Sequence, residues 1–522
     1  MIIRLPFAVL LSIAAVLVPP SLAAPDPDRP NFVIIMADDM GFSDIGCYGG
    51  EIQTPHIDRL ASEGLRFSQF YNCALCGPSR AALLTGLHPH QAGITSWTGL
   101  LNDRCVTLFE ALNRAGYATG AAGRLDMITA DNWHEPENIA RHVDRFLSTG
   151  GHQGPGGNYF EPTRNGRYFK DGEEIEYPSG RYKTDLLTDF AVDFLRERDD
   201  SRPFLLYMGH HAPHWPLHAK EEDIAKYRSL YRELGWDAAR EQRLERLVEE
   251  GLLPPDTKLS PLDARAEPWS ESTPHLDWEA ERMAVYAAQI DSLDQSVGRV
   301  MEALRAGGAD SNTLVFFFSD NGATERTVKV IDKPDWTWRS DDTPTRGAGN
   351  DPAVMPGPAD TFLSAGPAWS SLANTPFRYH KTSNHEGGIA SPLIAWWPEV
   401  VEQQGGISGE LSHIVDIMAT CLDAAGEPYP ENFDGREAHP LAGKSLLPVL
   451  EGRARAGHDS LCWATSGAKA VREGSWKLVA ANGKPWELYD LDTDRSELND
   501  LAAQHPERVA AMEKVFEEWH SR

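Results

Sequence analysis

The chain has 522 residues, of which 77 are acidic and 49 are basic, so its formal net charge at pH 7 is −28. A chain of this length exceeds one ordinary domain and predicts a large core with a smaller additional unit. Because nucleic-acid binding needs clustered Lys and Arg, this charge excludes a nucleic-acid partner, but a local basic pocket for an anionic substrate remains compatible with it. Six cysteines are too few for a scaffold built on disulfides.

The first 23 residues have the features of a secretory signal peptide. Arg4 is followed by an apolar run over residues 7–18 and then by the small-x-small sequence Ser21-Leu22-Ala23. A run of this length is too short to span a membrane permanently. The sequence therefore predicts a cleavable signal peptide, 1–23, and a periplasmic or secreted protein with no stable membrane span.

Two apolar strands each end in oxygen-bearing side chains. Residues 31–36 and 312–318 are the strands, and the side chains that follow them are Asp38 and Asp39, and Asp320 and Asn321. Ligands gather at the carboxyl ends of strands in an open α/β sheet, so we expect the two strand ends to meet. Adjacent buried carboxylates need a positive partner, and carboxylate with amide oxygen favours Ca²⁺ over Zn²⁺, with Mg²⁺ as the alternative. Taken alone, each pair of polar residues after a strand is more typical of a turn or a helix cap.

The stretch 71–86 contains Cys76-Gly77-Pro78-Ser79-Arg80, followed by Thr85-Gly86. Pro78 suits the first turn of a helix, because its φ is helical and its missing N–H would have no partner there. A helix over 79–84 then places residue 76 at the positive helix end, where an anion is stabilised. Cys73 and Cys76 could instead form a redox or zinc pair, but no second cysteine pair supplies further zinc ligands at the usual spacing.

This stretch resembles the sulfatase signature. The resemblance is to formylglycine-dependent sulfatases of the bacterial arylsulfatase type, within the alkaline-phosphatase-like superfamily, and it extends from Asn31 to Trp519. It implies that a maturation enzyme oxidises Cys76 to formylglycine, so that an aldehyde replaces the thiol. It also implies a divalent cation, whose ligands would be Asp38, Asp39, Asp320, Asn321 and the modified residue 76.

The clearest departure from the family pattern is Gly123-Arg124-Leu125-Asp126, where sulfatases usually have Gly-Lys-Trp-His. Arg124 keeps the positive charge with which the family's lysine holds sulfate, although Arg and Lys differ in reach and shape. Asp126 stands where the family has a histidine that contacts the formylglycine hydrate. A carboxylate repels sulfate and is a weaker base than imidazole, so impaired turnover and a shifted substrate class remain alternatives.

Two further segments resemble active-site motifs of the family. The strand over 204–208 leads into Ala212-Pro213-His214-Trp215-Pro216, which resembles Ala-Pro-His-x-Pro and nominates His214 as the proton donor to the leaving oxygen. Lys381, five residues before Glu386-Gly387-Gly388, matches the family's second active-site lysine. In the mechanism that the resemblance implies, a hydrate hydroxyl at residue 76 attacks sulfur, and the SO₃ group is neutralised by Arg80, Arg124 and Lys381. Asp126 is the candidate base for sulfate release.

The pattern of elements predicts an α/β fold. Helices over 184–197 and 278–304 precede the strands over 204–208 and 312–318, which is the order of a parallel sheet. We expect a large central sheet, mixed and mostly parallel, flanked by helices, and a small C-terminal antiparallel sheet plus helix. The predicted division is a signal peptide at 1–23, a catalytic domain at 26–457 with a helical insertion at about 220–282, and a C-terminal subdomain at 458–522.

We therefore expect a sulfuric ester hydrolase that acts on aryl sulfate or sulfated carbohydrate. Its partners would be a sulfated small molecule or glycan and the formylglycine-generating maturation enzyme. Arg124-Leu125-Asp126 leaves two alternatives. One is a formylglycine-dependent phosphodiesterase or phosphonate hydrolase, and the other is a catalytically impaired homologue that binds sulfoglycans.

Overall fold

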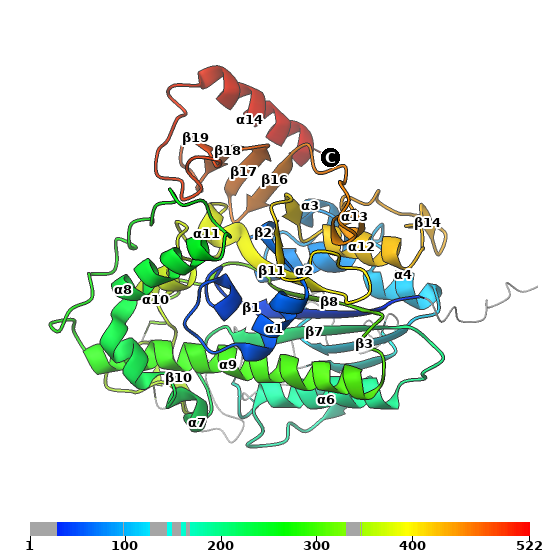
Figure 1. Cartoon of the computed structure of the whole chain (residues 1–522), viewed down its shortest axis with the longest axis horizontal. Coiled ribbons are helices and arrows are strands. Elements are labelled where there is room, and N and C mark those ends of the chain that lie inside the picture. Colours follow the sequence, from blue (N-terminus) through cyan, green and yellow to red (C-terminus); the bar gives the residue numbers. More distant parts are fainter. Residues whose placement is uncertain are drawn as a thin grey trace, which may run out of the picture.

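The computed structural model describes residues 29–97, 99–125, 143–148, 158–162, 168–329, 345 and 347–521. The predicted signal peptide, 1–23, and Asp126 lie outside these residues. Figure 1 shows a large sheet between two layers of helices, with a smaller sheet and a terminal helix beyond one layer. Within the described ranges, no helix combines the length and the apolar character needed to cross a membrane.

The large sheet has eleven strands. Their order is β12-β2-β11-β8-β1-β7-β3-β4-β5-β6, and β13 pairs with β2. Their bounds are β1 (Asn31–Asp38), β2 (Leu65–Tyr71), β3 (Ala118–Gly123), β4 (Arg145–Ser148), β5 (Tyr168–Lys170), β6 (Glu173–Ile175), β7 (Phe204–Pro213), β8 (Thr313–Ser319), β11 (Ala390–Trp396), β12 (Gly406–Ser408) and β13 (Ser412–His413). β1 is parallel to β7 and β8, and β3 is parallel to β7 and β4, whereas β11 is antiparallel to β2 and β8. The prediction of a mixed, mostly parallel sheet is confirmed.

Helices cover both faces of this sheet, so its central strands are apolar on both sides. One face carries α1 (Pro55–Glu63), α6 (Lys183–Glu197) and α9 (Leu276–Ala306), and the other carries α2 (Cys76–Thr85), α4 (Leu108–Arg114) and α12 (Asp416–Ala424). In β1, Val33 and Ile35 pack in the core beneath α1, α6 and α9. Phe32, Ile34 and Met36 point to the opposite face and pack in the core beneath α2, α4 and α12. The continuous apolar run of β1 therefore fills two cores.

β7 is longer than the sequence indicated. It extends to Pro213, past the predicted end at Met208, because its last residue still pairs with Asp38 at the end of β1. His210 and His211 are thus strand residues and are buried. The extension brings His214 directly to the edge of the sheet at which β1 ends.

Shorter elements connect the main ones. They are the 3₁₀ helix η1 (Gly46–Tyr48), α3 (Pro89–Ala92), α7 (Glu221–Ile224), α8 (Arg228–Glu249), α10 (Pro367–Ala373), α11 (Glu386–Ile389), α13 (Leu447–Leu450), the strand pair β9 (Gly347–Ala348) and β10 (Thr361–Phe362), and the pair β14 (Asn432–Phe433) and β15 (Arg436–Glu437). The predicted insertion at about 220–282 contains α7 and α8, and α8 kinks at Gly235, whose φ is +63°. A glycine tolerates this left-handed backbone, which other residues would not adopt easily.

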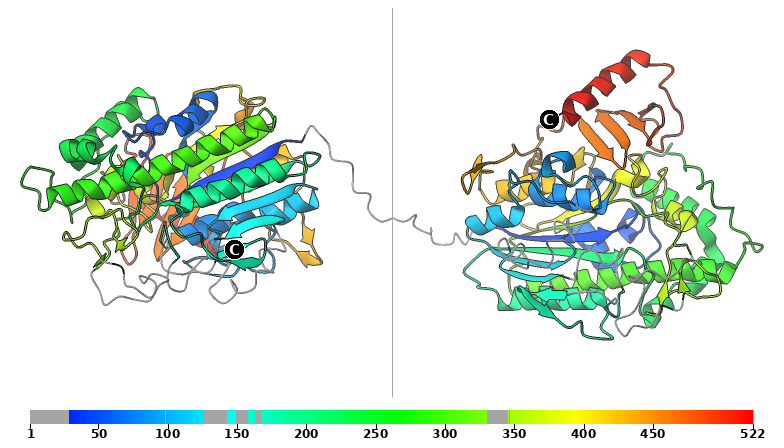
Figure 2. Two further views of the ribbon diagram at one scale, coloured as in Figure 1. Left: turned by 90° about the horizontal axis from the view of Figure 1, so that it is seen from below. Right: turned by 180° about the vertical axis from the view of Figure 1, so that it is seen from behind.

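The C-terminal unit is a four-stranded antiparallel sheet packed against one helix. Its elements are β16 (Leu461–Thr465), β17 (Ala468–Glu473), β18 (Trp476–Ala480), β19 (Glu487–Asp490) and α14 (Pro506–His520). Figure 2 shows the unit from behind, standing on the helical layer that contains α2 and α12. The prediction of a small C-terminal antiparallel sheet plus helix is confirmed. The domain boundaries themselves stay a prediction.

Candidate active site

The ends of β1 and β8 bring four oxygen-bearing side chains together. The two strands are parallel neighbours, and Ala37 pairs with Ser319 just before the polar residues begin. The backbone N–H of Asp39 donates to Asp320 Oδ1 over 3.2 Å, and Asn321 Nδ2 donates to Asp39 Oδ1 over 2.6 Å. Asp38 lies beside them, and all four side chains are buried. The expected meeting of the two strand ends is what the structure shows.

Within the part of the chain that the structure describes, three oxygen atoms of this cluster are buried and accept no hydrogen bond. They are Asp38 Oδ1, Asp39 Oδ2 and Asn321 Oδ1. A buried carboxylate or amide oxygen that accepts no hydrogen bond is costly, unless a cation takes the donor's place. Oxygen donors of this kind are the ligands of hard cations such as Ca²⁺ and Mg²⁺. The residues present therefore fit a divalent cation.

Three cationic side chains offset the three carboxylates. Arg80 Nη2 lies 2.8 Å from Asp320 Oδ2 and 3.6 Å from Asp38 Oδ2. Arg124 Nη1 forms an ion pair with Asp38 Oδ2, and Lys381 Nζ lies 2.5 Å from Asp39 Oδ1. Burial by itself would raise the pKa of Asp38, but the charges of Arg124, His214, Arg80 and Lys381 lower this pKa below its usual range. Burial and the negative charge of Asp38 raise the pKa of Asp320, because a second carboxylate charge so close to Asp38 is unfavourable.

Cys76 is the first residue of α2. The helix begins earlier than the predicted residue 79, and Pro78 still lies in its first turn. Cys76 Sγ is 3.5 Å from Arg124 Nη2, which links the helix end to the carboxylate cluster. Cys73 does not share this position, since its Sγ lies 3.9 Å from His413 Nε2. The structure describes all six cysteines, and it forms no disulfide among them.

His214 faces the same cluster from the end of β7. Its Nε2 lies 3.5 Å from Asp39 Oδ2, while its Nδ1 lies 2.5 Å from the carbonyl oxygen of Trp215. The carbonyl contact fixes the ring, so that Nε2 points at the cluster. Burial lowers the pKa of His214, and the nearby charges of Asp39 and Asp38 act in the opposite direction. Nine of the ten predicted site residues are thus in one place, and Asp126 lies outside the described residues.

The sequence analysis missed three residues around this cluster. The hydroxyl of Tyr207 accepts from Arg80 Nη1 over 3.1 Å and donates to the backbone oxygen of Arg124 over 2.9 Å, so it connects the two arginines. Lys183, the first residue of α6, is buried, and burial together with the charge of Arg124 lowers its pKa to about 7. Trp97 lies over Lys381. Nothing local in the sequence distinguished Lys183, Tyr207 or Trp97, because their burial and their contacts depend on residues far away in the chain.

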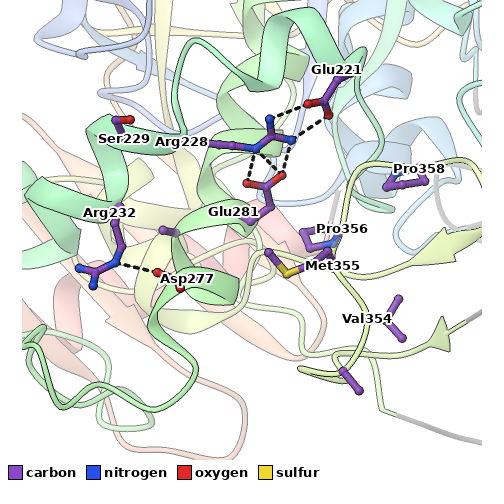
Figure 3. A pocket seen from close by; sticks show the side chains of 12 residues that line it. Glu221, Arg228, Ser229, Arg232, Asp277, Glu281, Val354, Met355, Pro356 and Pro358 are labelled. Carbon is purple, nitrogen blue, oxygen red and sulfur yellow. Dashed lines mark hydrogen bonds and ion pairs between the residues drawn. The ribbon is translucent and has the colours of Figure 1, made fainter.

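A separate cavity of about 650 Å³ lies between α7, α8, the start of α9 and residues 353–358. Figure 3 shows Arg228 between Glu221 and Glu281, and Arg232 beside Asp277. The predicted site residues are not among the residues that line this cavity. Its two arginines, Arg228 and Arg232, are both paired with carboxylates that line the same cavity.

Comparison with known proteins gives a consistent result. Residues 30–427 match the family model described as Sulfatase, and residues 377–521 match the model described as N-sulphoglucosamine sulphohydrolase, C-terminal. An uncharacterised sulfatase of Schizosaccharomyces pombe is 32% identical, over 94% of this chain and 93% of that protein. An arylsulfatase of Klebsiella aerogenes is 29% identical, over 83% of this chain and 94% of the enzyme.

A solved structure shares the fold. The crystal structure of Ps i-CgsB in complex with k-i-k-neocarrahexaose superposes with a TM-score of 0.68 at 24% identity, over 94% of this chain and 93% of that chain. At this identity, the likeness concerns the fold alone.

Proposed function

Because this chain belongs to the sulfatase family and is a sulfuric ester hydrolase, we propose that it hydrolyses aryl sulfates or sulfated carbohydrates with a formylglycine formed from Cys76. The reaction would convert R–O–SO₃⁻ and water into R–OH and sulfate. One observation carries the proposal: Cys76 begins α2 and its Sγ lies 3.5 Å from Arg124, which is itself paired with Asp38 in the carboxylate cluster. A helix N-terminus beside a guanidinium favours a sulfate group at this point.

We infer that Asp38, Asp39, Asp320 and Asn321 would hold a divalent cation, with residue 76 as a further ligand after its conversion. The three buried oxygens without partners support this inference. Ca²⁺ is the ion that we expect, and Mg²⁺ is the alternative. When bound, the cation would lower the pKa of a hydroxyl that coordinates it and would offset the carboxylate charge.

We assign roles to the remaining side chains from their positions in the candidate site. Arg80, Arg124 and Lys381 would neutralise the SO₃ group, because they are the cationic groups that converge on the cluster. His214 would donate a proton to the leaving oxygen from Nε2, which faces the cluster. Asp126 remains the proposed base for sulfate release.

We also propose that the protein is exported through its signal peptide and is converted at Cys76 by a formylglycine-generating enzyme. The support is the apolar run at residues 7–18 and the signature around Cys76. The substrate would be a sulfated small molecule or glycan.

The decisive experiment is peptide mass spectrometry across Cys76 combined with turnover of 4-nitrophenyl sulfate, in protein from a host that contains the maturation enzyme. We expect an aldehyde at residue 76 and sulfate release that is lost in Cys76→Ala. Cys73→Ala is the matched control, and it should keep both the aldehyde and the activity. Unmodified Cys76, or hydrolysis of an aryl phosphodiester with the sulfate ester inert, would contradict the proposal.

A further inference from the structure

Trp97 is a large apolar side chain that is 52% exposed beside the buried charge cluster. The centre of its ring lies 5.2 Å from Lys381 Nζ, and the same nitrogen lies 2.5 Å from Asp39 Oδ1. A single exposed apolar side chain is common at a protein surface, so the informative feature of this indole is its position beside the charge cluster. Contact with the ammonium group explains the position of one part of the ring but not the exposure of the rest.

The backbone around Trp97 is packed against the helix end that carries Cys76. A Cβ atom added at Gly77 would lie 2.7 Å from the carbonyl oxygen of Ser96 and 3.3 Å from that of Trp97. Such close approach is possible only because residue 77 has no side chain. Trp97 is therefore held between the first turn of α2 and Lys381, two parts of the candidate active site.

The burial of the cluster limits where a substrate can extend. Cys76, Lys381 and His214 are each almost fully buried, and so are the four oxygen-bearing side chains. When the SO₃ group lies among them, the organic part of the ester must point outwards, since the protein interior is closely packed. The indole next to Lys381 offers exposed apolar surface beside this cluster.

We propose that Trp97 forms a binding subsite for the ring that carries the sulfate ester. The ring would lie against the exposed part of the indole, which suits either an aryl ring or the apolar C–H face of a pyranose. This inference rests on the proposed function and names a specificity-determining residue for it. Trp97 takes no part in bond breaking; it holds the leaving group.

The test is steady-state sulfate release from 4-nitrophenyl sulfate, glucosamine 6-sulfate and n-propyl sulfate, together with inhibition by inorganic sulfate. Trp97→Ala should raise KM for at least one ring-bearing ester about tenfold with kcat changed less than about twofold, while Trp97→Phe keeps most of the affinity. KM for propyl sulfate and the inhibition constant of inorganic sulfate should change far less. The ring ester with the larger KM increase identifies the ring class that the subsite accepts.

Leu100→Ala is the matched control, because Leu100 belongs to the same segment and is 55% exposed. It should leave every constant close to that of the wild type. An equal loss for propyl sulfate and inorganic sulfate in Trp97→Ala would overturn the inference, because Trp97 would then act through Lys381. Unchanged KM for both ring-bearing esters, or the same loss in Leu100→Ala, would also overturn it. A wild-type protein that hydrolyses none of the three esters would instead contradict the proposed function on which the inference rests.

Discussion

At the scale of single residues, the candidate site is held together by buried charges of opposite sign. Three carboxylates are buried together, and three cationic side chains from distant parts of the chain neutralise them. Arg124 is central, because it contacts both Asp38 and Cys76 Sγ. It is also the position at which this chain departs from the family's usual lysine. The planar guanidinium can contact two groups at once, which a lysine ammonium does less well.

We predict that Arg124→Ala lowers kcat/KM for 4-nitrophenyl sulfate by about 10²–10³-fold, since it removes one donor to the developing charge. Arg124→Lys should retain more activity than Arg124→Ala, because it keeps the charge. Steady-state kinetics of the purified variants measures this. Arg59→Ala, at an exposed pair with Glu63 on α1, is the control and should match the wild type. Activity of Arg124→Ala within twofold of the wild type would contradict the assignment.

We predict that chelation of divalent cations lowers the melting temperature and abolishes sulfate release, and that added Ca²⁺ or Mg²⁺ restores both. An ion at 100 times its Kd would stabilise the folded state by about 2.7 kcal/mol. Asn321→Ala should shift the response to higher ion concentrations, as measured by thermal unfolding over an ion titration. Asp294→Asn removes a buried carboxylate that accepts from the backbone of Ile57, and it should leave the ion response unchanged. Equal ion responses in Asn321→Ala and the wild type would exclude Asn321 as a ligand.

At the scale of elements, α14 is held against the main unit partly by aromatic and histidine rings. His90 of α3 lies 4.4 Å from Trp519 of α14, and His88 lies 6.0 Å from His413 of β13, between ring centres. Burial lowers the pKa of both His90 and His413 to about 4. His520 lies nearby on α14, and His458 binds the carboxylate of Asp416 beside this cluster. The interface therefore contains histidines that fold in their neutral form.

The direction of the pH effect follows from these pKa values. Unfolded histidine has a pKa of about 6.5, so between pH 6.5 and 4 the unfolded state binds protons that the folded interface does not. The stability of the interface between α14 and the main unit is therefore unaffected by these histidines above about pH 6.5, and it decreases as the pH falls towards 4. We predict that amide exchange in α3 and α14 accelerates in this range before exchange in β1, β7 and β8.

The measurement is hydrogen exchange by mass spectrometry at a series of pH values, corrected for the intrinsic exchange rate. His90→Phe should reduce the acid sensitivity, because it removes one group that must gain a proton. His56→Phe, at an exposed histidine of α1, is the control and should leave it unchanged. Simultaneous loss of protection in α14 and in the large sheet would argue against a local effect.

At the scale of the whole molecule, buried charges join the C-terminal sheet to the segment that carries Lys381. Lys477 of β18 lies 2.8 Å from both Glu386 of α11 and Glu497, and Arg495 lies 3.2 Å from Glu386. Burial opposes ionisation of Glu386, but Lys477 and Arg495 dominate and lower its pKa to about 2. Because α11 leads from Lys381 into β11, the C-terminal unit supports the wall of the candidate site.

We predict that Lys477→Met destabilises the protein by about 3–5 kcal/mol, because it leaves Glu386 and Glu497 buried without this partner. Urea unfolding measures the change, and kcat/KM for 4-nitrophenyl sulfate should fall with it if the position of Lys381 depends on the network. Lys514→Met, at an exposed lysine of α14, is the matched control and should cost less than about 0.5 kcal/mol. A cost below about 1 kcal/mol for Lys477→Met would show that the network contributes little.

The elements of the fold were predictable because their signals are local. The apolar runs of β1 and β8 and the periodicity of α6 and α9 all act through neighbours in the sequence. Element ends were less predictable. β7 continues to Pro213 because β1 offers it a partner, and that partner lies far away in the chain.

Some features of the candidate site likewise follow from neighbouring residues, whereas others depend on residues far apart in the chain. The sequence by itself determined the family resemblance, the position of Cys76 at a helix start and the oxygen-bearing ends of two strands, because each depends on residues close together in the chain. Only the tertiary structure decided that Arg124 neutralises Asp38, that Lys381 neutralises Asp39 and that Trp97 lies over Lys381. The physical reason is that a buried charge is stabilised by whichever opposite charge folding brings within a few ångströms, and distance along the chain does not specify that partner.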